Sequence, residues 1–198
     1  MLNFIKNRLN RFRKDDDGSI IAEAVIMFPT LFAAVLATFV FFDAFRNQAI
    51  IVKANYTLAD TLSRQSTYVT NTQMINTWNL HRFLTSSTSL TRLRISAIEY
   101  DADQDKHTVV WSRAKGGGSN FDDSGINAID LTISQIPVIP DGEFLIVVQT
   151  QVDYEPNFSI GLGAFTFDNI SYTRHRWAPQ FCYSHNDTAG GAICADGA

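Results

Sequence analysis

Residues 18 to 42 read "GSIIAEAVIMFPTLFAAVLATFVFF", and one charged residue, Glu23, interrupts an otherwise apolar run. A helix from Ile20 to Phe42 is roughly 34 Å long at about 1.5 Å per residue, enough to cross a hydrocarbon core of about 30 Å. The alternative is a core helix of a soluble domain, but this window lacks the polar face that an amphipathic helix needs. The sequence therefore predicts a single membrane-spanning helix.

The charges on either side of this run predict its orientation. Five basic residues precede it and two follow within the next twenty residues: Lys6, Arg8, Arg11, Arg13 and Lys14 before, Arg46 and Lys53 after. The positive-inside rule then keeps the N-terminus in the cytoplasm, so the residues after Phe42 are exported. A cleaved secretory signal is the alternative, but a signal peptide has a shorter apolar region and a small-residue cleavage site behind it. We therefore expect the segment to be retained as an anchor.

The helix is expected to continue beyond the membrane. Residues 43 to 65 contain no Pro or Gly, and apolar residues recur there at spacings that fit one helical face, namely Phe45, Ala49, Val52, Leu58, Ala59 and Leu62. This predicts one long helix over residues 19–66 whose second half packs on the domain that follows. A second helix is predicted from about residue 71, capped by Asn71 or Thr72, with an apolar face of Met74, Ile75, Trp78 and Leu84.

The pattern then changes to that of strands. Residues 91–100 and 106–114 alternate around a polar turn, which predicts a hairpin, and residues 142–156 and 168–179 read as strands ended by Pro156 and Pro179. Helices followed by four strands indicate an α+β fold, with a roughly four-stranded antiparallel sheet packed on the long helix. The chain thus divides into a leader (1–18), a long helix (19–66) and an exported domain (67–198).

Residues 157 to 167, "NFSIGLGAFTF", place three phenylalanines in a glycine-bearing stretch between two strands. We expect this stretch to cap the core. Contact with lipid or with a neighbouring subunit is the alternative.

The only two cysteines, Cys182 and Cys194, flank a Gly- and Ala-rich segment near the C-terminus. In an exported domain they are expected to close a small disulfide loop. Two free thiols are the alternative. A zinc pair is disfavoured, because His185 is the one histidine between them and fits no standard ligand spacing.

No pattern in the sequence nominates an active site, a metal or a cofactor. Asp101, Asp103 and Asp105 have the first spacings of a calcium loop, but Lys106 replaces its glycine and Ser112 its last carboxylate. We therefore expect a solvated turn, and a protein that is not an enzyme. Nucleic acid is also an unfavourable partner, since the chain carries 16 Lys and Arg against 20 Asp and Glu and five of the basic residues lie in the leader.

The glutamate in the apolar run needs an explanation. A charged side chain costs about 2.5 to 3.5 kcal/mol at the centre of a span and less near its end, and the span contains no Lys or Arg to offset it. If the chain were cut after Gly18, Ser19 would carry a free ammonium and Glu23 would be the fifth residue. The carboxylate would attract that ammonium, on its own chain or on an adjacent subunit, more strongly in lipid than in water.

A basic leader, Gly18 at the cut, Glu23 five residues later and a hydrophobic helix resemble the processing site of type IV pilins and pseudopilins. With Pro29 six residues after Glu23, "GSIIAEAVIMFP" is more specifically similar to the TadE-like (TadE/TadG) minor pilins of bacterial tight-adherence, or Flp, systems. Three later stretches resemble the exported half of such proteins: "TVVWSRA", "IPVIPDGEFLIVVQTQVDYEP" and "RHRWAPQFC".

This resemblance implies a role in pilus assembly and adhesion. A prepilin peptidase would cut between Gly18 and Ser19, Glu23 would align the subunit, and the helix would anchor it in the bacterial inner membrane beside other pilins and assembly-platform proteins. Pro29 would remove one helical hydrogen bond and kink the span. Ala24 departs from the aromatic residue that often follows the glutamate in major Flp pilins, which favours a minor pilin.

Three other classes remain open. The first is an uncleaved single-pass anchor that carries a periplasmic binding or scaffold module. The second is a membrane-anchored periplasmic enzyme, and the third is an adhesin that binds a surface or glycan without any effect on pilus assembly.

Overall fold

The computed structural model describes Lys6, Arg8, Asn10 and residues 19–87, 90–126, 136–137, 139–158, 160–177, 179–186, 188 and 190–196. These residues form two compact units. The first unit holds the chain up to Ala44 together with Pro156–Gly163, and the second holds Phe45–Glu155 and Ala164–Ala198.

The long helix α2 spans Ser19–Ser63 and contains one proline, Pro29. It ends three residues earlier than the sequence predicts. The N–H groups of Arg64 and Gln65 donate to the carbonyls of Thr61 and Leu62, three residues back, so the last turn tightens and the α-helix stops.

Within the second unit, α2 buries one stripe of side chains. The buried residues recur every three or four positions and are Ile51, Ala54, Asn55, Leu58, Ala59, Leu62 and Ser63. The predictions for Leu58, Ala59 and Leu62 are confirmed. Those for Phe45 and Ala49 are wrong, because both lie away from this stripe around the helix and are exposed.

The second helix, α3, spans Asn71–Thr85. Its N-cap is Thr70, and not Asn71 or Thr72 as predicted. The Thr70 hydroxyl accepts from the N–H of Gln73 at 3.1 Å while the Gln73 side chain accepts from the N–H of Thr70 at 3.1 Å, which is a capping box. Met74 is buried as predicted, whereas Ile75 is exposed.

The main sheet is antiparallel throughout, in the order β3-β2-β4-β5, which confirms the predicted α+β fold. Its strands are β2 (Thr91–Asp101), β3 (Lys106–Lys115), β4 (Phe144–Tyr154) and β5 (Phe165–Thr173). The last strand was predicted over residues 168–179 and instead begins earlier and ends at Thr173.

A second sheet was not predicted. It has the order β1-β6-β7 and is built from β1 (Val69–Thr70), β6 (Gln180–Ser184) and β7 (Ile193–Asp196). The pair β1–β6 is parallel and the pair β6–β7 antiparallel. The segment that follows β5 therefore starts a new sheet and does not extend the first one.

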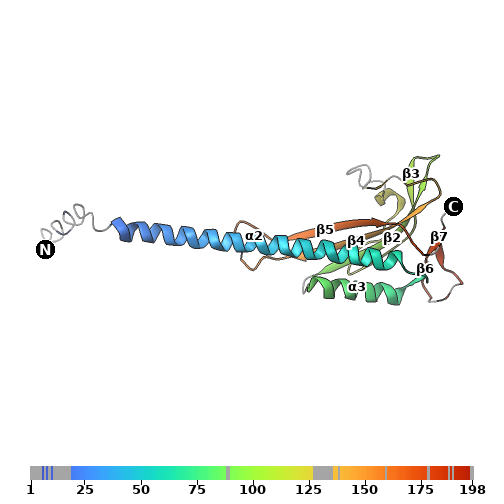
Figure 1. Cartoon of the computed structure of the whole chain (residues 1–198), viewed down its shortest axis with the longest axis horizontal. Helices are drawn as coiled ribbons and strands as arrows, with labels where there is room; N and C mark the ends of the chain where they lie inside the picture. Colours follow the sequence, from blue (N-terminus) through green and yellow to red (C-terminus); the bar gives the residue numbers. More distant parts are fainter. Residues whose placement is uncertain are drawn as a thin grey trace. The chain divides into compact units, whose positions relative to one another are not determined.

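The helices cover one face of the main sheet. The end of α2 and α3 pack on the main sheet, with α3 against β2 and β3, and in Figure 1 α3 runs alongside the end of α2. We call the cluster between these layers the helix-side cluster. It contains Leu58 and Leu62 from α2, Met74 from α3 and Ile95 and Ile146 from the sheet. Burial of this apolar surface is the main stabilising term of the second unit.

Because of a β-bulge in β3, two side chains that are two residues apart pack in different clusters. Ala97 pairs with Trp111, but Ile98 pairs with Val109, so Val110 is an extra residue in β3. Trp111 therefore joins the helix-side cluster, whereas Val109 packs against the second cluster, which includes Ile98.

The phenylalanines of residues 157–167 do not cap the core as expected. Phe158, Phe165 and Phe167 belong to neither buried cluster. Phe165 and Phe167 pack edge to face, 4.7 Å between centroids, beside Tyr154 at the end of β4.

Candidate functional site

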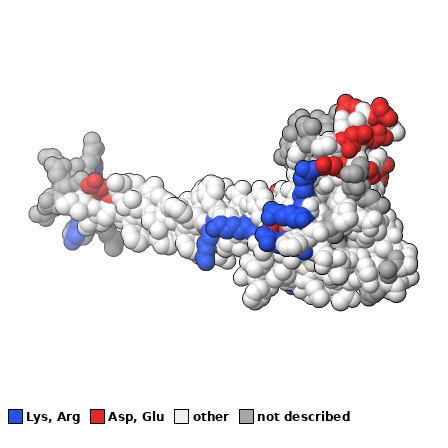
Figure 2. All heavy atoms as spheres, turned by 45° about the vertical axis from the view of Figure 1, so that its right-hand side comes forward, with Lys and Arg blue, Asp and Glu red and all other residues white. Residues whose placement is uncertain are grey.

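The first half of α2 exposes apolar side chains on all sides. Ile20 is 77% and Phe28 72% exposed, and only 6% of the most apolar 18-residue stretch of the helix is buried. In Figure 2 a long stretch of this helix shows no Lys, Arg, Asp or Glu atoms, between the red atoms near its N-terminal end and the first blue atoms further along. A core helix of a soluble domain would be mostly buried. Among the described residues, this is the one helix long and apolar enough to cross a membrane.

The two threonine hydroxyls of this segment are hydrogen-bonded within the helix. The hydroxyl of Thr30 donates to the carbonyl of Ile26, and that of Thr38 to the carbonyl of Ala34 at 2.8 Å. A hydroxyl bonded four residues back needs no water, which suits a hydrocarbon environment. These two threonines are therefore compatible with a span.

Gly18, the predicted cleavage position, lies outside the described residues. Ser19 is the first residue of α2, so the helix begins where the proposed cut would leave the new N-terminus. Glu23 opens the second turn and is exposed. No salt bridge joins Glu23 to any residue that the structure describes.

Pro29 lies inside α2, about one and a half helical turns after Glu23. It has no N–H, so it leaves one carbonyl of the preceding turn without its helical donor. The rings of Phe28 and Phe32 stack beside it, with centroids 6.3 Å apart and an interplanar angle of 10°. The α-helix continues through Pro29.

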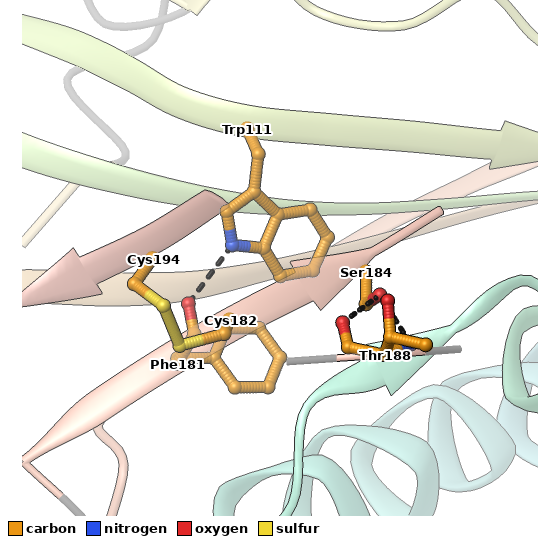
Figure 3. Close-up of a disulfide and its surroundings, with 6 residues drawn as sticks. All are labelled: Trp111, Phe181, Cys182, Ser184, Thr188 and Cys194. Atoms are coloured by element: carbon orange, nitrogen blue, oxygen red, sulfur yellow. Dashed lines mark hydrogen bonds between the residues drawn. A yellow bond between two sulfur atoms is a disulfide. The ribbon is translucent and has the colours of Figure 1, made fainter. Parts of the chain in front are cut away.

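The cysteines lie opposite each other in β6 and β7, where the structure joins Cys182 to Cys194 in a disulfide. Phe181, the residue before Cys182, is held by Trp111, whose indole N–H donates to the carbonyl of Phe181 at 2.9 Å. Figure 3 shows this bond next to the disulfide. The Trp111 ring also packs on Phe181 and Tyr183, at 5.0 and 5.6 Å between centroids. Trp111 thus connects the two sheets.

An open groove of about 440 Å³ runs beside the disulfide. Its lining residues are Ser66, Thr67, Tyr68, Pro179, Gln180, Cys182, Ala192 and Cys194. This lining contains no charged side chain and no histidine, so it offers neither an acid–base pair nor a metal ligand set.

Acidic side chains gather at the β2–β3 turn, at one end of the second unit (Figure 2). The Asp101 carboxylate accepts from the N–H groups of Asp103 and Gln104, at 3.0 and 3.1 Å. A hydrogen bond to Asp105 raises the pKa of Tyr100. Asp101 is thus used in closing the turn, and no group of three or more metal-binding side chains occurs in the described part of the chain.

His81 lies in α3 and matches no motif in the sequence. It is fully buried, and neither ring nitrogen has a hydrogen-bond partner among the described residues. Burial lowers its pKa to about 4. A neutral imidazole is therefore held inside the fold, which no local sequence signal indicates.

Comparison of the chain with protein-family models, with curated proteins and with solved structures gave no match. The function must therefore be inferred from the chain's own residues.

Proposed function

We propose that this protein is a TadE-like minor pilin or pseudopilin that serves assembly of a bacterial tight-adherence pilus. It is anchored in the inner membrane by one helix, with the N-terminus in the cytoplasm and an exported α+β domain. Its role is structural and involves no catalysis.

One observation supports the proposal, namely that the two halves of α2 differ in burial. The helix starts at Ser19, its first half is apolar and exposed, and residues of its second half such as Leu58 and Leu62 belong to the domain core. A pilin subunit needs the same two properties in one element, since the helix must enter both a membrane and a globular domain.

Glu23 supplies the assembly function in this proposal. It is the one acidic residue between Ser19 and Asp43, and it lies four residues after the proposed new N-terminus. After cleavage the ammonium of Ser19 on an adjacent subunit would neutralise the carboxylate. Glu23 would thereby fix the axial position of one subunit against the next.

The intact mass of the protein from its native membrane tests the proposal. We expect a loss of residues 1–18, and we expect Gly18→Ala to restore the full-length mass because the peptidase would no longer recognise the cut.

A full-length mass of the unaltered protein, in a host that has the peptidase, would overturn pilin processing. The uncleaved anchor with a periplasmic binding or scaffold module would then be the better assignment. Cells that lack the peptidase provide the control, since the mass there must be full length in either case.

A further inference from the structure

The loop between β4 and β5 contacts the apolar helix. Pro156–Gly163 falls in the same compact unit as the helix up to Ala44. The ring of Phe158 meets the ring of Phe39 in a T-shaped contact, with centroids 6.4 Å apart and an interplanar angle of 68°. Both side chains stay largely exposed, Phe158 by 45% and Phe39 by 54%.

Phe39 marks a definite depth along the apolar run. From Ile20 to Phe39 the helix rises roughly 29 Å, close to the thickness of about 30 Å of a hydrocarbon core. With Ile20 at one boundary of the bilayer, Phe39 lies at the other. Phe158 therefore lies at the boundary as well, because its ring touches that of Phe39.

The composition of the loop suits this depth. No charged residue occurs between Glu155 and Asp168, whereas six of the twelve residues in between are Phe, Ile, Leu or Ala. Ile160 and Leu162 are half-buried, so the loop presents Phe158 as its most exposed apolar side chain.

The backbone of the loop sets a limit on how deeply it enters. Residues 156–158 and 160–163 are in neither a helix nor a strand. Irregular backbone is not tolerated in contact with the hydrocarbon core, because its N–H and C=O groups need partners. At the interface, water can hydrate these groups while the aromatic ring points into the acyl chains. An interfacial position satisfies both the side chains and the backbone.

We propose that the Pro156–Gly163 loop is a second membrane contact, which inserts Phe158 into the lipid interface beside the end of the span. The proposal rests on the membrane anchorage assigned above. Lipid is the occupant because Phe158 continues the apolar surface of the helix at Phe39, and that surface already requires lipid around it. The loop then gives the protein a membrane contact besides the helix itself.

A fluorescent label at the loop tests this contact in the full-length protein. Asn157 is exposed and next to Phe158, so Asn157→Cys carries an environment-sensitive label without removing the ring. In phosphatidylcholine vesicles we expect blue-shifted emission and quenching by lipids with a spin label near the headgroup. Phe158→Asp in the same background should abolish both effects, because an ionised carboxylate is excluded from the acyl region.

Two further label positions make the outcome decisive. A label at Asp103→Cys, in the solvated β2–β3 turn, should be quenched by aqueous iodide and not by the lipids. A label at Phe32→Cys should be quenched by lipids that carry the spin label deep in the chain. If position 32 is in lipid and position 157 is as accessible to iodide as position 103, the loop contact is refuted while the anchor stands; if position 32 is also aqueous, the anchorage itself fails.

A second copy of the chain is the competing occupant. Emission at position 157 that changes with protein density in the vesicle, and not with the lipid quencher, would replace lipid by a neighbouring subunit and overturn the proposal.

Discussion

At the scale of single residues, His81 is a titratable group that the fold removes from water. Its imidazole is fully buried in α3 without a partner among the described residues, and its pKa is lowered to about 4. Protonation therefore favours the unfolded chain, where a histidine has its ordinary pKa of 6.5.

We expect this histidine to make the domain acid-sensitive. A lowered pKa means that the unfolded state binds more protons between about pH 6.5 and pH 4, so stability is full above this window and falls as the pH drops through it. The total loss is on the order of 3 kcal/mol at about 1.4 kcal/mol per pKa unit. Thermal unfolding in detergent at pH 7.5, 6, 5 and 4 measures it.

His81→Leu should flatten the pH profile between these limits, since the titrating group is gone. The exposed His185 gives the matched control, and His185→Gln should leave the profile of the unaltered protein intact. An unchanged slope in His81→Leu would show that another group causes the acid sensitivity.

The residues of the proposed site and His81 differ in how far the sequence reveals them. Glu23 is visible as a charge in an apolar run, which is a purely local anomaly. His81 looks like any polar residue on a helix, because its burial depends on strands that come later in the chain. Phe45 was misassigned for the opposite reason, since an apolar side chain at a plausible spacing need not face the core.

At the scale of elements, the small sheet depends on a covalent link. The disulfide pairs Cys182 in β6 with Cys194 in β7, and β6 also carries Phe181, the partner of Trp111. We expect Cys182→Ser/Cys194→Ser to lower the free energy of unfolding by about 2 to 4 kcal/mol, because the unfolded chain gains the freedom of an open loop. Unfolding midpoints with and without reductant measure this loss.

Reduction of the unaltered protein should reproduce the midpoint of the double variant, and reductant should have no effect on the variant. The far-UV spectrum should persist in both, since the β3-β2-β4-β5 sheet does not contain the cysteines. Equal midpoints for the oxidised and reduced protein would contradict the prediction.

The elements that the sequence predicts are those with a long, clear period. The helix-length apolar run and the alternation in residues 91–100 and 106–114 are local patterns, and the long helix and the strands β2 and β3 appear in the structure. The small sheet escapes such analysis, because β1 has two residues and pairs with β6 more than a hundred positions later. The break after Thr173 was missed because the prediction took Pro179, the next residue that ends a strand, as the boundary.

At the scale of the whole molecule, the role proposed for Glu23 requires contact between subunits. We expect Glu23→Ala to insert into the membrane as well as the unaltered protein, because it removes a charge from the apolar run, and to reduce surface pili to a small fraction of the normal number. Carbonate extraction of membranes measures insertion, and counting of sheared pili measures assembly.

Conservative variants separate charge from shape. Glu23→Gln should behave like Glu23→Ala, whereas Glu23→Asp should retain part of the assembly because the carboxylate is kept. Normal piliation of Glu23→Gln would exclude an electrostatic role for this residue.

The helix-side cluster also limits when the domain can fold. Its members run from Leu58, which comes before any strand, to Ala195, in the last strand of the chain. This core cannot close before Ala195 has left the ribosome, because β7 contributes to it. If the domain is exported as proposed, the chain from Leu58 onward crosses the bilayer unfolded before its earliest apolar residues meet their partners.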